Sequence, residues 1–202
     1  MASTPEQNDT ARLEAFSDGV FAIAITLLVL EIRLPGGNAT LAQKLLATWP
    51  SYVGYVISFV TIGIMWANHH AIFRLIGRTT HGLIVGNLLL LLTVAFLPFP
   101  TTVLADHLRH GGGDQRTATV FYSATFIVIA IGFQLLWQVA SYNNRLIAPG
   151  CEDAAAEVSR SYRYGIPAYT FTTIVAAFSV PTCLALVGAM ALYWLIPRGR
   201  VR

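Results

Sequence analysis

The chain has few charged residues, few cysteines and no patch of basic residues interleaved with aromatic ones. Asp, Glu, Lys and Arg together make up 11% of its 202 residues, whereas a soluble domain normally carries about 25%. The charged residues also lie in clusters, so long neutral stretches separate them. This distribution argues against a soluble globular protein, and the missing basic patch argues against nucleic acid as a partner.

The possible metal ligands are also sparse. The two cysteines are Cys151, in a polar segment, and Cys183, in an apolar run, and they fit neither a disulfide framework nor a zinc site. His107 and His110 with Asp106 offer a weak surface zinc site, but a solvated loop is the better interpretation. We therefore expect no resident metal and no cofactor.

What the sequence does contain is long apolar runs. Hydrophobic residues make up 55% of the chain, and its mean hydropathy is +0.60. Runs of this length are typical of an all-α, multi-pass membrane protein, because a transmembrane β-barrel would show short alternating strands. We expect a single transmembrane domain over residues 1–202, with a polar lead at 1–11 in which Asp9 or Thr10 caps the first helix. Six spans are predicted, at residues 12–34, 50–73, 82–105, 118–142, 162–179 and 181–197.

Prolines mark the breaks between and within these spans. The first span stops at Pro35-Gly36-Gly37, and the third ends in Phe96-Leu97-Pro98-Phe99-Pro100, where a kink is expected. The final apolar region fits one overlong helix or two short ones. Pro181 and the length of the region favour a helical hairpin of two spans.

The basic residues predict the topology. With six spans and an inside N-terminus, nine of the 13 Lys and Arg residues lie in inner segments, in agreement with the positive-inside rule. The inner nine are Arg12, Arg74, Arg78, Arg145, Arg160, Arg163, Arg198, Arg200 and Arg202, and the outer four are Arg33, Lys44, Arg109 and Arg116. The first span is too long for a signal-peptide core and has no basic leader, so we expect it to be retained. Both termini are then cytoplasmic, in a protein of the plasma membrane.

Polar side chains gather at the inner ends of the first three spans. Ionisable groups inside a span are costly and mark function or a firm structural pairing. This level holds Arg12, Ser17, Asp18, Trp66, His69, His70 and Asn87. We expect a hydrogen-bonded network around Asp18, and a structural role in locking the helices together is favoured over direct handling of ions or protons. Adjacent histidines on a helix point about 100° apart, which argues against a metal site.

The helical wheel of the first span separates two faces. One face carries Phe16, Gly19, Ile23, Thr26, Leu27, Leu30 and Leu34, and the opposite face carries Asp18, Phe21, Ile25, Leu28 and Ile32. The polar face is expected to meet the rest of the bundle. The apolar face is free to meet lipid, another helix or something else, and periodicity alone does not distinguish these.

The string Arg12-x-x-x-Phe16-Ser17-Asp18-x-x-Phe21 resembles the signature of the transmembrane protein 175 potassium channel family. Trp66-x-x-His69-His70, Asn87 and Phe96-Leu97-Pro98-Phe99 are similar to the family pattern too. The resemblance implies a single-repeat bacterial member that assembles as a homotetramer, with the first helix of each copy lining a central pore. By the same resemblance, the apolar constriction is made by Ile23, Leu27 and Leu30, and Thr26 supplies a hydroxyl layer linked to selectivity. Arg12, Ser17, Asp18, Trp66, His69 and Asn87 would form the supporting network.

The expected function is therefore a potassium-permeable cation channel in the lipid bilayer, with K⁺ as a permeant ion rather than a cofactor. An apolar ring of this kind can gate by dewetting. Glu31 could concentrate cations near the outer mouth, although a salt bridge with Arg33 or Lys44 is at least as good an interpretation. The alternative is a secondary transporter or small-solute carrier, disfavoured because the chain shows no inverted repeat. An enzyme is not expected, since no catalytic constellation shares a midplane.

Overall fold

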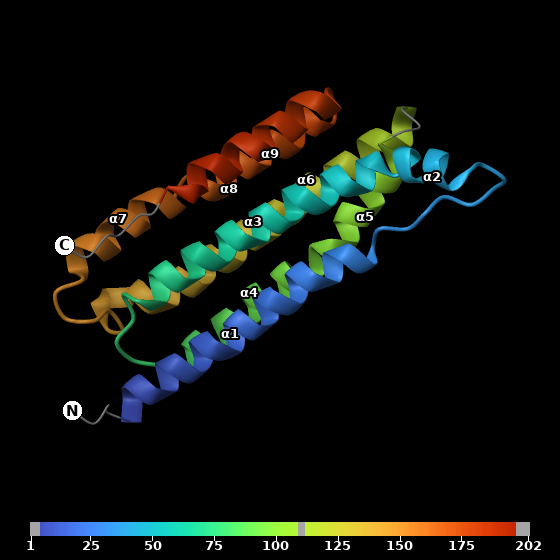
Figure 1. The fold of residues 1–202 in the computed structure, drawn as a ribbon. Coiled ribbons are helices and arrows are strands. Elements are labelled where there is room, and N and C mark those ends of the chain that lie inside the picture. The colour runs from blue at the N-terminus through green and yellow to red at the C-terminus, as the bar shows by residue number, and fades with distance from the viewer. Residues whose placement is uncertain (1–4, 109–111, 197–202) are drawn as a thin grey trace.

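The computed structural model describes residues 5–108 and 112–196, and in these ranges the regular elements are helices. The long helices lie side by side along one axis, so the described chain is an elongated bundle (Figure 1). The helices are α1 (Pro5–Leu30), α2 (Leu41–Ala47), α3 (Trp49–Phe73), α4 (His81–Phe96), α5 (Pro98–His107), α6 (Gly112–Ser141), α7 (Glu152–Tyr162), α8 (Gly165–Ala176) and α9 (Val180–Leu195), with a 3₁₀ turn η1 (Tyr142–Asn144).

Four helical stretches in the described residues are long and apolar enough to cross a membrane. They cover Asp9–Leu30, Trp49–Phe73, His81–His107 and Gly112–Asn144. The helix α9 is apolar but has only 16 residues, and α8 has 12. The chain is therefore a multi-pass helical membrane protein, and the count of six spans stays a prediction.

Helix α1 is longer at its start and shorter at its end than the sequence predicts. The expected polar lead is already helical from Pro5, so Asp9 and Thr10 lie inside the helix and do not cap it. The Thr10 hydroxyl instead pairs with that of Thr79 (Oγ1···Oγ1 2.8 Å). The helix ends at Leu30, four residues before the predicted limit. Residues 1–4 of the predicted lead lie outside the described residues.

Two breaks fall where the prolines place them. The third long stretch is divided at Leu97, where α4 ends and α5 begins with Pro98. The final apolar region turns back between α8 and α9. Ser179 caps α9 there, and its hydroxyl oxygen accepts a hydrogen bond from the Thr182 backbone N–H (3.4 Å). A short helix that was not predicted, α2, begins at the capping box of Thr40 and Gln43.

The core lies around α6, and α1 lies at the edge of the bundle. Gly132 of α6 approaches α4 so closely that an added Cβ would lie 3.2 Å from the Leu90 Cα. Trp137, Tyr122 and Phe126 of the same helix are almost fully buried. In the most apolar window of α1 22% of the residues are buried, compared with 44% in each of the other three long stretches. The helix that carries the candidate site is thus the least covered of these four long stretches.

Candidate functional site

The predicted apolar stripe of α1 lies on the outside of the chain. The exposed fractions of Ile23, Leu27 and Leu30 are 59%, 41% and 67%. Phe21 and Leu28, on the opposite face, are buried against the bundle. The helical wheel therefore predicts correctly which face of α1 meets the rest of the chain. What the exposed face meets in the membrane stays a prediction.

Thr26 lies on the exposed side with the stripe. Its hydroxyl donates to the Ile23 carbonyl oxygen one turn earlier (Oγ1···O 2.9 Å). A threonine hydroxyl that donates within its own helix still offers lone pairs outward. Thr26 can therefore present an oxygen beside the apolar stripe without leaving its own proton unsatisfied.

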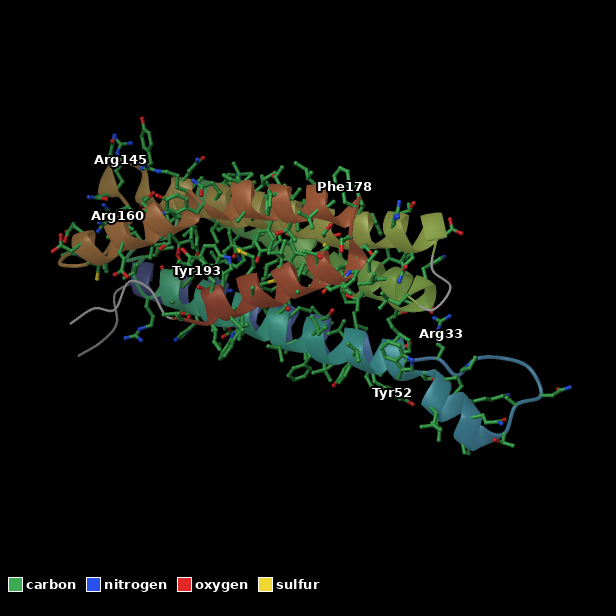
Figure 2. The ribbon with its side chains drawn as sticks, turned by 90° about the horizontal axis from the view of Figure 1, so that it is seen from above. Arg33, Tyr52, Arg145, Arg160, Phe178 and Tyr193 are labelled. Atoms are coloured by element: carbon green, nitrogen blue, oxygen red, sulfur yellow. The ribbon has the colours of Figure 1, made fainter. Side chains whose placement is uncertain are left out.

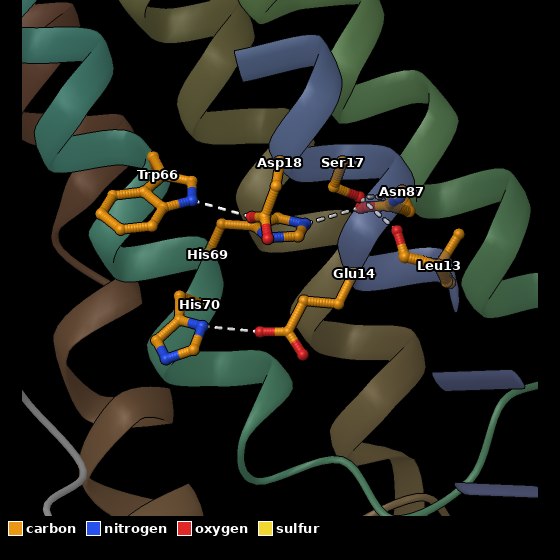
Figure 3. Close-up of polar contacts among 8 residues, drawn as sticks. All are labelled: Leu13, Glu14, Ser17, Asp18, Trp66, His69, His70 and Asn87. Carbon is orange, nitrogen blue, oxygen red and sulfur yellow. Dashed lines mark hydrogen bonds and ion pairs between the residues drawn. The ribbon is translucent and has the colours of Figure 1, made fainter. Parts of the chain in front are cut away.

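A buried chain of hydrogen bonds fixes the other face of α1 to α3 and α4. The Asn87 amide donates to the Ser17 hydroxyl (Nδ2···Oγ 2.8 Å), which donates in turn to the Leu13 carbonyl oxygen (2.8 Å). The Asn87 Oδ1 pairs with His69 Nε2 at 2.8 Å. Because the amide oxygen only accepts, His69 Nε2 is the donor. Ser17, His69 and Asn87 are fully buried, so one continuous chain joins three helices (Figure 3).

The His69 ring is held by aromatic packing as well. It stacks on Phe73 with ring centroids 4.3 Å apart and meets Phe21 at 5.3 Å. Its second nitrogen, Nδ1, is buried without a hydrogen-bond partner in the described part of the chain. The histidine therefore serves as a hydrogen-bond donor fixed between two phenylalanines, and it is not placed as a metal ligand.

Two further pairs join α1 to α3 on a more exposed side. The Trp66 indole N–H donates to the Asp18 carboxylate (Nε1···Oδ1 2.8 Å), and His70 pairs with Glu14 (Nδ1···Oε1 2.6 Å). Glu14 and Asp18 are one helical turn apart, as are Trp66 and His70, so the two helices match turn for turn (Figure 3).

The structure thus divides the predicted network into two sets. Asp18 contacts Trp66 and is not the centre of the buried chain, which runs through Ser17, Asn87 and His69. Arg12 is exposed and makes no hydrogen bond or ion pair within the described residues, so its supporting role stays a prediction. Glu14 also belongs to the more exposed set and was not predicted from the sequence. Its spacing of four residues before Asp18 is the signal that could have placed it on the same face.

At the other end of α1, the carboxylate of Glu31 accepts a hydrogen bond from Thr102 of α5 (Oγ1···Oε2 3.1 Å). In the described residues Glu31 forms no ion pair with Arg33 or Lys44, so that interpretation is wrong for the single chain.

The loop considered as a surface zinc site is described only in part. His107 Nδ1 pairs with the Val103 carbonyl oxygen (2.8 Å), and His110 lies outside the described residues. The part of the chain that the structure describes contains no group of three or more potential metal ligands.

These features define a membrane helix bundle whose first helix is anchored by polar contacts on one face and bare on the other. A family model described as endosomal/lysosomal potassium channel TMEM175 matches residues 12–98, the segment that holds the buried chain. A potassium channel of Chamaesiphon minutus is 42% identical over 96% of this chain and 97% of its own length. A potassium channel of Streptomyces collinus is 43% identical over 93% of this chain and 92% of its own length. The chain belongs to the TMEM175 family, which confirms the resemblance and makes it a member of a channel family rather than an enzyme.

Solved structures agree with this assignment. The crystal structure of a homologue, from Chamaesiphon minutus, of the lysosomal potassium-selective channel TMEM175 superposes with a TM-score of 0.83 and 40% identity, covering 93% of this chain and 97% of that one. Among vertebrate relatives, the Danio rerio protein is named an endosomal/lysosomal proton channel. It is 33% identical over 87% of this chain, which spans 33% of its length.

Proposed function

We propose that this chain forms a potassium-permeable channel of the plasma membrane, in which four copies surround a pore lined by α1. The proposal rests on the position of α1, which has the smallest buried share of the four long stretches. It turns Ile23, Leu27 and Leu30 outward, while hydrogen bonds fix its other face. The bacterial relatives that this chain matches over almost their whole length are named potassium channels, which supports the same activity here.

The apolar stripe would act as the gate. Isoleucine and leucine side chains from four copies, meeting at an axis, leave a constriction that holds no continuous column of water, so an ion faces a high barrier there. Widening the ring admits water and lowers the barrier. We propose Ile23 as the narrowest point, with Leu27 and Leu30 extending the constriction.

Selectivity for K⁺ over Na⁺ would come from the layer of Thr26 hydroxyls. Each copy offers one hydroxyl oxygen beside the stripe, and the proton of that hydroxyl is already directed to the Ile23 carbonyl. Four such oxygens are fewer ligands than a filter of stacked carbonyl rings presents. The expected preference for K⁺ is therefore modest.

The buried chain of Ser17, Asn87 and His69 would set the rotation of α1 about its own axis. The hydrogen bonds that join these three residues favour one arrangement, since another rotation of α1 would leave Asn87 and Ser17 without each other. Lipid tails are as apolar as leucine, so apolar packing alone is a weak guide to rotation in a membrane. These hydrogen bonds therefore position the stripe without touching the permeant ion.

We also propose that both termini are cytoplasmic. Asn68 of α3 donates to the Trp194 carbonyl oxygen near the end of α9 (Nδ2···O 2.9 Å), two residues after Trp66, which meets Asp18 in the middle of α1. The first half of α1 runs on from this level, so the start of α1 and the end of α9 lie toward the same end of the bundle (Figure 1). The basic residues favour the cytoplasm for that end. Arg109, Arg198, Arg200 and Arg202, which entered the prediction, lie outside the described residues.

Planar-bilayer recording of the purified protein under a K⁺/Na⁺ gradient tests the proposal. We expect unitary currents whose reversal potential is shifted from zero toward the equilibrium potential of K⁺. Ile23→Asn should raise the current and reduce selectivity, while Leu92→Asn, which places the same amide on an exposed face of α4, should leave both unchanged. Flux that saturates without unitary currents would indicate a carrier.

Because vertebrate relatives are named proton channels, a second recording uses a pH gradient with impermeant ions on both sides. A reversal potential that follows the proton gradient would replace K⁺ by H⁺ as the main permeant ion.

A further inference from the structure

Two loops at the polar end of the bundle, the end that holds Ser17 and His69, are joined by a backbone clamp. We use this name for residues 75–77, after α3, and 146–148, after η1. Ile76 and Ile147 form an antiparallel β-bridge. Gly77 N–H donates to the Leu146 carbonyl oxygen and Ala148 N–H to that of Leu75, both at 2.8 Å. The loop between α3 and α4 is thereby fixed to the loop that follows α6.

The clamp is tight at Gly77. A Cβ added there would lie 3.2 Å from the Ala148 Cα and 3.3 Å from its Cβ. A side chain at residue 77 must therefore push the two loops apart. This gives a way to disturb the clamp without changing any charge.

The clamp places two arginines at facing positions of the two loops. The register that pairs Ile76 with Ile147 places Arg78 opposite Arg145 one step beyond the last bonded pair. Consistently, the Arg78 guanidinium donates to the Arg145 carbonyl oxygen (Nη2···O 3.2 Å). Like charges opposite one another on paired segments are destabilising. Both side chains are exposed, and within the described residues neither forms an ion pair.

The position of this pair corresponds to the membrane surface. Arg78 follows the end of α3, and Arg145 follows the end of α6, both long membrane-crossing helices. Tyr142, three residues before Arg145, is 66% exposed, as expected for an aromatic residue at the level of lipid headgroups. Figure 2 shows Arg145 and Arg160 at the same end of the molecule, far from Arg33. The positive-inside rule requires only positive charges at this end of the bundle, and not two arginines at facing positions of paired loops.

We propose that Arg78 and Arg145, held by the clamp, bind the phosphate group of an anionic phospholipid. The planar guanidinium matches phosphate geometry in pairs of parallel hydrogen bonds. Arg78 uses one N–H on the Arg145 carbonyl and keeps the others for a ligand. The bound phosphate offsets the repulsion between the two arginines and anchors the loop between α3 and α4 at the membrane surface.

The test measures binding of phosphatidylglycerol, phosphatidylcholine and inorganic phosphate to the full chain, purified and delipidated in a neutral detergent, by native mass spectrometry. We expect phosphatidylglycerol to bind at least tenfold more tightly than phosphatidylcholine. Each arginine is expected to contribute about fivefold, so Arg78→Gln with Arg145→Gln should remove most of the preference. Arg160→Gln, on α7 at the same end, is the matched control and should retain it.

Gly77→Val provides the charge-preserving variant. It should lower the preference for phosphatidylglycerol several-fold, since it separates the loops but leaves both guanidiniums in place. Each variant is first checked by size-exclusion chromatography, and the wild-type measurement remains decisive if one does not fold. Equal binding of the two lipids, an equal loss in Arg160→Gln, or full preference in Gly77→Val would each overturn the proposal. So would inorganic phosphate that competes as well as the lipid, because that result would identify a free-anion site.

Discussion

The two faces of α1 are held by different kinds of interaction. One face buries Phe21, Ala24 and Leu28 and is joined to its neighbours through Ser17, while the other leaves Ile23 and Leu30 uncovered. Between apolar helices in lipid, burial supplies little driving force, and hydrogen bonds and close packing decide the arrangement. The polar face therefore positions the bare one, and four experiments test this division.

Phe21→Ala should give the largest effect on stability. The ring is 1% exposed and packs on His69, so its removal leaves a cavity and is expected to cost about 3 kcal/mol. Ile23→Ala, two residues away on the bare face, should cost under about 1 kcal/mol in the isolated chain. Thermal unfolding in detergent, at a concentration where the protein is monomeric, compares the two. Equal losses would mean that the bare face is already packed within the chain.

Asn87→Ala tests the buried hydrogen-bond chain. It leaves the buried His69 Nε2 donor without an acceptor and removes the hydrogen bond that Ser17 accepts, although the Ser17 hydroxyl still donates to Leu13; the expected cost is about 2 kcal/mol. Because α1 can then rotate, gating should change as well. Asn68→Ala is the control, since it removes an amide of the same size from α3 whose bonds do not involve α1. Unchanged single-channel behaviour in Asn87→Ala would separate the buried chain from the stripe.

Trp66→Phe removes the indole N–H that donates to Asp18 and keeps an aromatic ring in place. Trp66 is 43% exposed, so the expected loss of stability is about 1 kcal/mol. Asp18→Asn offers a neutral acceptor to the same donor and should lose less. A larger loss for Asp18→Asn than for Trp66→Phe, measured by thermal unfolding, would show that the carboxylate has another partner, such as a second copy of the chain.

Glu14→Gln should have the smallest effect. The pair of Glu14 with His70 is partly exposed, and pairs of this kind contribute roughly 0–1 kcal/mol and weaken with salt. The unfolding midpoint should shift little at low ionic strength and not at all at high ionic strength. A shift that persists at high salt would place this pair in a dry environment, as in an interface between copies.

Much of this arrangement could be predicted from the sequence. The apolar runs identify the long helices, and the period of α1 separates Ile23 from Phe21, because both signals depend on hydrophobicity alone. The start of α1 at Pro5 and the pairing of Glu14 with His70 were not predicted from the sequence. A polar helix that extends beyond the apolar run carries no apolar signal, and a carboxylate finds its histidine through the register of two helices.

The division of the buried chain from Asp18 needed the structure for a similar reason. Ser17 and Asp18 are neighbours in sequence but point about 100° apart on a helix. One therefore enters the core towards Asn87, while the other lies at the edge beside Trp66. The positions of these residues along the predicted spans place them all at one level of the membrane. Only the directions of their side chains separate the buried chain from the pair of Asp18 and Trp66.

Two polar attachments flank the apolar second half of α1: Asp18, in the middle of the helix, is bound to α3, and Glu31, just past its last residue, is bound to α5. Between them lie 12 residues, about 20 Å of helix, in which apolar side chains make the contacts with neighbouring helices. This segment is held by a hydrogen bond at each end and by apolar contacts alone in between. Rotation of the whole segment would break both hydrogen bonds, whereas a slight bend of its middle would shift the stripe outward or inward and keep both. Bending is therefore the motion of α1 that costs the least free energy.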